Sequence, residues 1–292
     1  MSKILGVGIA TLDIINEVSH YPAEDEELRA GAQQIARGGN CANTLDVLSQ
    51  LGHDCHLCAT LADDPDSGRI RESLMRQGVA TALCQHIEDG HAPTSYITRN
   101  RQNGSRTIVH YRDLPELEAD HFCQLPISDF DWFHFEGRNP LEVVRMLEYV
   151  QAQRSEQPIS IEVEKERPDI DALYAFADVL IFSRSFVLGR KHDTAEEFLR
   201  IMRAHAPGAL LVCPWAEEGA WMLDHEDQLH HALAQPPEQI VDTLGAGDCF
   251  NAGLIHALAT GSSATEALAQ ANQVAGRKIG QIGFDQLFGD QS

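Results

Sequence analysis

Short apolar runs alternate with amphipathic segments along most of the chain, beginning with an apolar run at 4–9. Apolar residues at helical spacing predict helices over 40–51, 66–77, 140–153, 169–176, 194–204, 246–260 and 263–279. Apolar runs between them predict strands over 55–60, 131–135, 158–163, 178–182 and 208–213. Short apolar strands between helices are typical of a mostly parallel sheet covered on both faces, so the pattern predicts an α/β sandwich.

Two segments interrupt this alternation, residues 14–37 and residues 93–112. Both are polar and strand-like without helical periodicity, and the second contains Asn103-Gly104 between extended arms, which is a strong hairpin signal. Two arrangements are compatible with this pattern. The segments could pair into a small sheet over a substrate site, or they could be two long surface hairpins without such a role.

Composition narrows the classes of function. The chain has 292 residues, of which 43% are hydrophobic, enough for one large domain or a domain with a small appendage. Its formal net charge of −22 argues against binding to nucleic acid and to an anionic membrane surface. The early apolar run is too short to span a bilayer and has no signal-peptide cleavage region after it, so we expect a cytoplasmic protein.

The seven cysteines have no framework spacing, so we expect reduced thiols in a chain of this size. Cys55 and Cys58 form a CxxC, which could indicate a metal or redox pair. They lie in an apolar run that is typical of a strand, where side chains three apart point to opposite faces. With no second pair nearby, we expect both cysteines to be structural.

The segment from Val241 to Gly253 combines two glycines and a carboxylate at the predicted start of a helix. Gly245 and Gly247 let the backbone approach a phosphate closely, and the unpaired amides of a helix N-terminus favour an anion there. Asp248 would be repelled by a phosphate unless it acted on a proton. The alternative is an ordinary glycine turn followed by a first-turn acid.

A second helix start, at 37–43, carries two carboxamides one helical turn apart. Asn40 and Asn43 can face the same direction, and a carboxamide both donates and accepts hydrogen bonds, as sugar hydroxyls do. The alternative is an N-cap at Asn40 with Asn43 on the surface. Asp13, which we expect at the end of the first strand, would by itself be interpreted as a turn residue.

Two signatures carry a family resemblance. The string D-T-x-G-A-G-D-x-F at 242–250 resembles the signature of the ribokinase-like sugar kinases, the PfkB family, and G-G-N-x-x-N at 38–43 resembles that family's other signature. Strings at 21–25, 135–139, 162–165 and 213–219 resemble the ketohexokinase branch of the family. The resemblance implies a single ribokinase-like domain over 1–292, a three-layer α/β/α sandwich with a small β-sheet lid formed by about 14–37 and 93–112.

The resemblance implies ATP-dependent transfer of the γ-phosphoryl group to a sugar hydroxyl, with a ketohexose such as fructose as the acceptor and fructose 1-phosphate as the product. The catalytic residues it implies are an anion hole formed by the amides of Gly245, Ala246 and Gly247, and the base Asp248. The substrate-binding residues it implies are Asp13, Asp25, Gly39, Asn40, Asn43, Glu136 and Arg138. The nucleotide-binding residues it implies are Arg106, Pro214, Trp215, Ala216 and Glu217, together with Gly245 and Gly247.

The resemblance also implies Mg²⁺, with K⁺ as a further cofactor to test, and a homodimer formed through the lid sheet, in which Asp25 could reach the partner's sugar. Glu162 and Glu164 alternate on a predicted buried strand, and two carboxylates sharing a face are costly without a cation. We therefore expect them near the magnesium and its waters. The Asn-x-x-Glu element that organises magnesium in many relatives has no clear counterpart at 182–189.

Alternatives to these assignments stay open at the level of sequence. Arg106 could only balance charge at the hairpin, and Glu136 with Arg138 could form a local ion pair. The acceptor could be another small sugar, a sugar phosphate or a nucleoside. A sugar or nucleotide sensor that has lost catalysis is the rival from another class, and the intact Asp248 argues against it.

Overall fold

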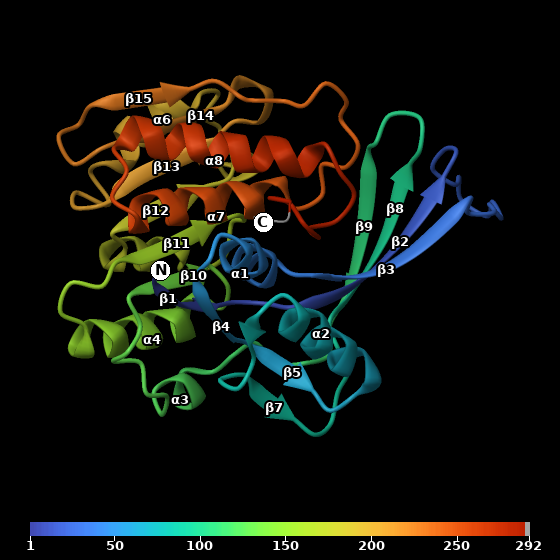
Figure 1. The fold of residues 1–292 in the computed structure, drawn as a ribbon, viewed down its shortest axis with the longest axis horizontal. Helices are drawn as coiled ribbons and strands as arrows, with labels where there is room; N and C mark the ends of the chain where they lie inside the picture. The colour runs from blue at the N-terminus through green and yellow to red at the C-terminus, as the bar shows by residue number, and fades with distance from the viewer. Residues whose placement is uncertain (290–292) are drawn as a thin grey trace.

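A nine-stranded sheet runs through the computed structural model, which describes residues 1–289 (Figure 1). Its strands in spatial order are β15 (Leu229–Ala232), β14 (Ala220–Leu223), β13 (Leu210–Pro214), β12 (Val179–Phe182), β11 (Ile159–Val163), β10 (Trp132–Glu136), β1 (Lys3–Val7), β4 (Asp54–Cys58) and β6 (Val79–Ala80). Neighbours from β6 to β13 are parallel, and β14 and β15 add an antiparallel edge. The prediction of an α/β fold with a mostly parallel sheet is confirmed.

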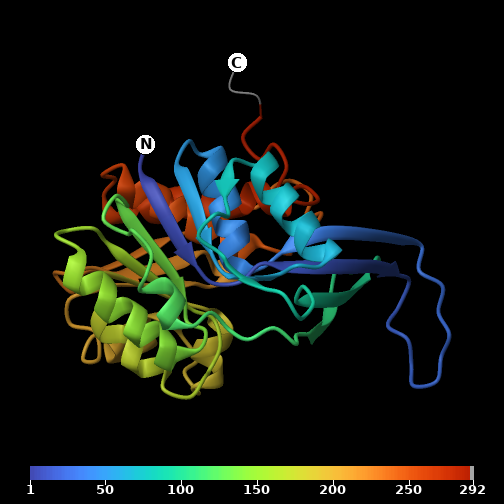
Figure 2. The ribbon, with the colours of Figure 1, turned by 90° about the horizontal axis from the view of Figure 1, so that it is seen from below.

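Helices cover both faces of this sheet, which gives three layers (Figure 2). One face carries α1 (Asn40–Gln50), α2 (Pro65–Arg76), α7 (Ala246–Ala259) and α8 (Ala264–Ile279). The other face carries α3 (Ala119–Phe122), α4 (Pro140–Gln153), α5 (Arg184–Gly189), α6 (Ala195–Met202) and the 3₁₀ helix η1 (Ile170–Phe176). Each layer has its own buried apolar cluster, because the strands place alternate side chains on opposite faces.

The predicted helices are present with ends that differ by at most two residues, except at 169–176. That segment is a 3₁₀ helix and not an α-helix. Asp169 starts it in a left-handed conformation, with φ 62°. Ile170 and Leu173 are both buried, and a helix of three residues per turn keeps positions three apart on one face. The short strands β6, β14 and β15 were not predicted, because two to four residues carry too little periodicity.

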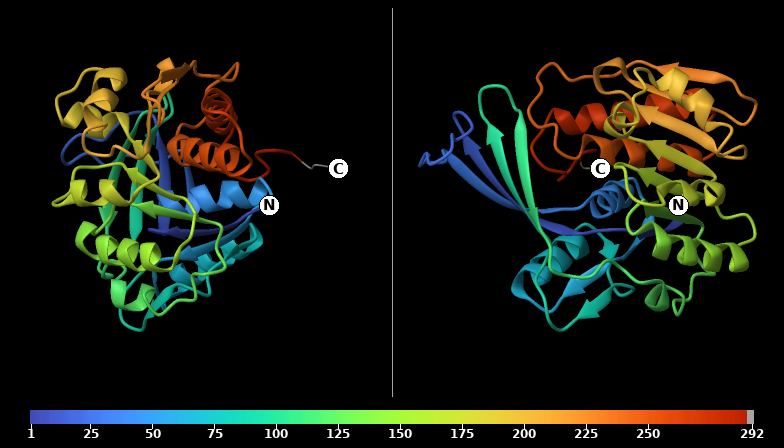
Figure 3. Two further views of the ribbon diagram at one scale, coloured as in Figure 1. Left: turned by 90° about the vertical axis from the view of Figure 1, so that its left-hand side faces the viewer. Right: turned by 180° about the vertical axis from the view of Figure 1, so that it is seen from behind.

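A second sheet stands beside the helical layers (Figure 3). We call it the small sheet, and its strands in spatial order are β3 (Ala32–Gly38), β2 (Thr11–Val18), β8 (Thr94–Asn100) and β9 (Arg106–Tyr111). β8 and β9 form the hairpin predicted at Asn103-Gly104, and Gly104 has a φ of 70°. Such a positive φ suits glycine, which explains the residue at this turn. The remaining strands, β5 (Thr60–Ala62) and β7 (Gln85–Ile87), form a separate two-stranded sheet.

The seven cysteines are all free thiols, and six of them are buried. Cys55 belongs to the apolar cluster on one face of the main sheet and Cys58 to the cluster on the other. The prediction that this CxxC is structural agrees with their placement. Within residues 1–289, no helix is long and apolar enough to cross a membrane.

Candidate active site

A cavity of about 610 Å³ lies between the small sheet and the carboxyl ends of β11, β12 and β13. Parallel α/β sheets place ligands at this edge, and the volume is in the range of small-molecule sites. The predicted residues that line the cavity are Asp13, Gly39, Asn40, Asn43, Arg106, Arg138, Glu162, Glu164, Pro214, Gly245, Ala246, Gly247 and Asp248. These residues come from segments more than 200 positions apart, and the fold brings them to one cavity.

Residues 242–247, which we call the glycine loop, lead into the N-terminus of α7. Gly245 is the N-cap residue with φ 78°, and no side chain caps the first turn. A Cβ at Gly245 would lie 2.3 Å from Cζ of Phe284, so the position has no room for a side chain. A Cβ at Gly247 would meet no atom within 4 Å, so Gly247 faces open space. An uncapped helix start that opens onto a cavity is suited to bind a phosphate through its amides.

Asp248 lies in the first turn of α7 and is buried, with 7% of its surface exposed. Its Oδ2 accepts a hydrogen bond of 2.6 Å from Nδ2 of Asn43. Burial raises the pKa of Asp248 to about 7, and the Asn43 hydrogen bond opposes this rise. The neighbouring charges of Glu136 and Glu164 raise the pKa further, while that of Arg37 lowers it. A carboxylate with a pKa near neutrality can take up a proton in a reaction at physiological pH.

Glu162 is held between two carboxamides. Its Oε2 accepts a hydrogen bond of 3.2 Å from Asn40, and its Oε1 accepts one of 3.0 Å from Asn251. Burial, followed by the charge of Asp248, raises the pKa of Glu162 well above its usual range. Asn251 was not predicted, although it follows Asp248 by three positions on one helix, a spacing that puts both on the same face.

Asp13 lies within β2 of the small sheet and not at the end of the first strand as predicted, and it is 7% exposed. Thr11 donates its hydroxyl to Oδ1 at 2.9 Å, and burial raises the pKa of the Asp13 carboxyl. A Cβ at Gly38 would lie 2.2 Å from Oδ2 of Asp13, and a Cβ at Gly39 would lie 2.4 Å from the carbonyl oxygen of Ile9. The two glycines of the G-G-N string are therefore required by the close approach of these neighbouring segments.

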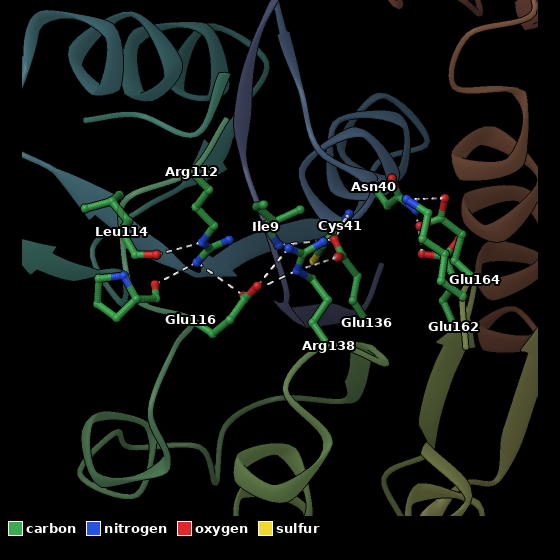
Figure 4. A network of polar contacts seen from close by, with 12 residues as sticks. Ile9, Asn40, Cys41, Arg112, Leu114, Glu116, Glu136, Arg138, Glu162 and Glu164 are labelled. Atoms are coloured by element: carbon green, nitrogen blue, oxygen red, sulfur yellow. Dashed lines mark hydrogen bonds and ion pairs between the residues drawn. The ribbon is translucent and has the colours of Figure 1, made fainter. Parts of the chain in front are cut away.

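Glu136 and Arg138 have different surroundings (Figure 4). Glu136 accepts hydrogen bonds from the backbone amides of Ile9 at 3.1 Å and Cys41 at 2.6 Å, and it is not among the described residues that line the cavity. Arg138 lines the cavity and donates to Glu116 at 2.8 and 3.3 Å, while its nearest approach to Glu136 is 3.9 Å. Glu136 thus joins β10 to the segments at the end of β1 and the start of α1, and contact with substrate stays a prediction.

Arg106 connects the small sheet to the glycine loop. Its Nη1 donates to the hydroxyl of Thr243 at 2.9 Å. This contact places a guanidinium at the rim of the cavity, beside the N-terminus of α7. An arginine in that position can bind phosphate oxygens with two donors at once.

Four other predicted residues lie outside the cavity of this chain. Trp215 is 4% exposed and packs in the apolar core, and Ala216 and Glu217 follow it in the 3₁₀ helix η2 (Ala216–Glu218), where Glu217 pairs with Arg184 on the surface. Asp25 lies in the exposed loop that joins β2 to β3. The structure does not bring these side chains to the cavity, so their nucleotide and sugar contacts stay predictions.

The residues available for a metal ion are few. Among residues 1–289 there is no group of three or more His, Cys, Asp or Glu side chains that could hold one. Glu164 lines the cavity and pairs with Lys165 at 3.3 Å, and both oxygens of Glu162 accept amide hydrogens. This set fits a hydrated Mg²⁺ bound mainly by substrate phosphates, which needs few protein ligands.

The loop in front of α7 pairs with a buried cation from α8, Lys278. Nζ of Lys278 is fully buried and donates to Oδ2 of Asp242 at 2.9 Å and to its carbonyl oxygen at 3.2 Å. The ammonium therefore already uses two oxygens of Asp242. Binding of K⁺ stays a prediction.

Comparisons with known proteins agree with this geometry. The family model described as pfkB family carbohydrate kinase matches residues 1–286. The chain belongs to the pfkB family of carbohydrate kinases. Ketohexokinase of Mus musculus is 40% identical over 291 residues, covering 97% of this chain and 98% of the mouse protein. Ribokinase of Bacillus subtilis (strain 168) is 23% identical and covers 97% of this chain and 94% of its own length.

Solved structures show the same fold. The structure of Arabidopsis thaliana ribokinase complexed with ribose and ATP superimposes with a TM-score of 0.81 at 19% identity, covering 97% of this chain and 94% of that chain. Ribokinase from Giardia lamblia superimposes with a TM-score of 0.85 at 15% identity, covering 97% and 96%. The ribokinase-like α/β fold expected from the two signatures is confirmed.

Proposed function

We propose that this carbohydrate kinase uses ATP to phosphorylate a ketohexose such as fructose at its first hydroxyl, giving fructose 1-phosphate. One observation carries the proposal: the carboxylate of Asp248 opens onto the same cavity as the carboxamides of Asn40 and Asn43 and the glycine loop. The similarity to mouse ketohexokinase over nearly the whole of both chains supports the choice of acceptor.

The acceptor side of the reaction uses the polar groups of the small sheet and α1. Asp13, Asn40 and Asn43 hydrogen-bond the sugar and orient the reacting hydroxyl toward Asp248. Asp248 accepts the hydroxyl proton as the oxygen attacks the γ-phosphoryl group, and its raised pKa matches this task near neutral pH.

The phosphate side uses backbone amides. The first-turn amides at Gly245–Gly247 and the guanidinium of Arg106 stabilise the charge of the transferring phosphoryl group. Mg²⁺ bound with the nucleotide supplies charge neutralisation, and Glu164 and Glu162 would hold its waters. Closure of the small sheet as a lid excludes water and limits hydrolysis of ATP.

The outer surface of the small sheet supports a homodimer. Tyr96, Val109 and Tyr111 on it are 49%, 65% and 53% exposed, and apolar groups on a sheet favour a covering partner. In such a dimer Asp25 reaches the partner's sugar site from its exposed loop. The location proposed for the enzyme is the cytoplasm. Size-exclusion chromatography with light scattering tests the dimer, and a monomer at micromolar concentration contradicts it.

A panel of acceptors in an ADP-release assay tests the proposed function. Fructose, tagatose, ribose, a sugar phosphate and adenosine are compared, with Asp248→Asn as the control that lacks the base. We expect the highest kcat/KM for fructose and a loss of about 10²- to 10⁴-fold in kcat for Asp248→Asn, with ATP binding retained. If another acceptor has the higher kcat/KM, the assignment of fructose as substrate is wrong. Saturable sugar binding without ADP release contradicts the assignment of kinase activity.

A further inference from the structure

Arg37 is a buried arginine at the end of β3, and its side chain is 4% exposed. Its Nη1 donates to Oδ1 of Asn43 at 2.7 Å. Its Nη2 forms an ion pair with Asp46, whose side chain is 2% exposed. A guanidinium held by a buried carboxylate keeps a fixed position, because moving it would leave a charge unpaired. Asn43 therefore meets a donor that does not move.

The carboxamide of Asn43 has two different ends, and the structure assigns each a partner. Its Oδ1 accepts from Arg37, while its Nδ2 donates to Oδ2 of Asp248 at 2.6 Å. Arginine has donors only, and an ionised carboxylate has acceptors only. A flipped amide would set two donors against each other at Arg37 and two acceptors against each other at Asp248. The observed orientation is the one that satisfies both neighbours.

We propose that Arg37 is a positioning residue for the base: it fixes the orientation of the Asn43 carboxamide and, through it, the direction in which Asp248 presents its carboxylate to the acceptor. This inference rests on the proposed function, because it concerns the base of that reaction. Arg37 itself reaches Asp248 through Asn43.

The charges around Asp248 give Arg37 a distinct effect. Glu136, Glu162 and Glu164 all lie near Asp248, and each acid disfavours its ionised form. The charge of Arg37 favours the ionised form, as does the amide that it orients. The acids and Arg37 therefore act in opposite directions on the same carboxylate.

A group of side chains behind Arg37 also touches the glycine loop. The second oxygen of Asp46 accepts from Gln50 at 2.8 Å, and Gln50 donates to the carbonyl oxygen of Phe284 at 2.8 Å. The ring of Phe284 lies 5.8 Å from Cζ of Arg37 and occupies the space that a Cβ at Gly245 would need. The position of Arg37 is thus set relative to the loop expected to bind phosphate.

The test removes both charges of the buried pair. The double variant Arg37→Gln with Asp46→Asn avoids leaving Asp46 ionised and unpaired, which would destabilise the fold. We expect kcat to fall about 10- to 100-fold, the effect of losing one hydrogen-bonding group next to a charge, while the KM for ATP stays within about twofold. Arg69→Gln is the control, because Arg69 on α2 is 61% exposed and lines, together with Arg37, a second cavity of about 550 Å³ that Asp248 does not line.

A mutant cycle through Asn43 separates positioning from a general loss of structure. In the Asn43→Ala background we expect the Arg37→Gln and Asp46→Asn pair to change kcat by less than about twofold, because its route to Asp248 is already gone. If the Arg37 and Asp46 pair lowers kcat in the Asn43→Ala background by the same factor as in the wild type, the proposal is overturned. The double variant of Arg37→Gln with Asp46→Asn could fail to fold, so Arg37→Lys, which keeps a cation opposite Asp46, is measured in the same cycle. We expect the same coupling to Asn43 for Arg37→Lys.

Asp248→Asn measured in the same assay separates this inference from the proposed function. If Asp248→Asn keeps the wild-type kcat, the assignment of the base is wrong and the proposed function loses its mechanism. If Asp248→Asn is inactive while the Arg37 variants keep the wild-type kcat, only the positioning role is overturned.

Discussion

The pH dependence of turnover follows from the burial of Asp248. Burial raises its pKa to about 7, and a base must be ionised to accept a proton. Its ionised fraction then falls from about 90% at pH 8 to about 10% at pH 6, so kcat/KM for the sugar falls about tenfold between these values. The hydrogen bond of 2.6 Å from Asn43 favours the ionised form.

Removing that hydrogen bond gives the prediction its magnitude. A hydrogen bond to a charged group contributes about 1.5 to 3 kcal/mol, which corresponds to about 1 to 2 units of pKa. Asn43→Ala is therefore expected to move the acid limb of the profile to higher pH by about 1 to 2 units.

Initial rates of ADP release measure both profiles, at constant ionic strength and saturating Mg-ATP. The alanine side chain is neutral, so the variant adds no titrating group of its own to the profile. A wild-type limb centred below about pH 5.5, or a limb that Asn43→Ala leaves in place, refutes the reasoning that links burial, the amide and the base.

Two further predictions concern stability. The pKa of Asp248 is raised from 3.8 in the unfolded chain to about 7 in the folded protein, so its protonated carboxyl stabilises the fold fully below pH 3.8 and this stabilisation is lost as the pH rises to about 7. Asp248→Asn has no proton to lose and should therefore gain in Tm over the wild type between about pH 5 and 7. Thermal melts at matched pH measure this, and a gain that does not grow with pH contradicts it. Gly245→Ala should lower the free energy of unfolding by about 1 to 3 kcal/mol, because φ is 78° and the new Cβ would meet Phe284. Gly261→Ala, at φ 83° with no atom within 4 Å, is the matched control in urea denaturation, and equal losses would exclude the contact with Phe284 as a cause.

The glycine loop could be predicted from the sequence because its parts are local. Gly245, Gly247 and Asp248 lie within four positions, and the helix that follows shows the expected periodicity. Asn40 and Asn43 were found for the same reason, one turn apart at the start of α1.

The rest of the site depends on contacts between distant segments. Glu136, for which substrate contact stays a prediction, accepts hydrogen bonds from backbone amides 127 and 95 positions away, and the sequence did not predict these two contacts. Glu162, which we expect near the magnesium, also accepts hydrogen bonds from Asn40 and Asn251, 122 and 89 positions away, and the sequence did not predict these two contacts. Such pairings follow from the register of the sheet and the packing of helices on it, which hydrophobic periodicity does not specify.

The buried thiols make this chain a reporter of its own opening. Six of the seven cysteines are buried, Cys123 is partly exposed, and burial raises the pKa of all seven thiols. The folded protein therefore resists alkylation and oxidation at neutral pH, since the thiolate is the reactive form. A thiol reagent reaches the six buried groups only when the layers on either side of the main sheet separate, so the rate at which each is labelled measures how often that layer opens.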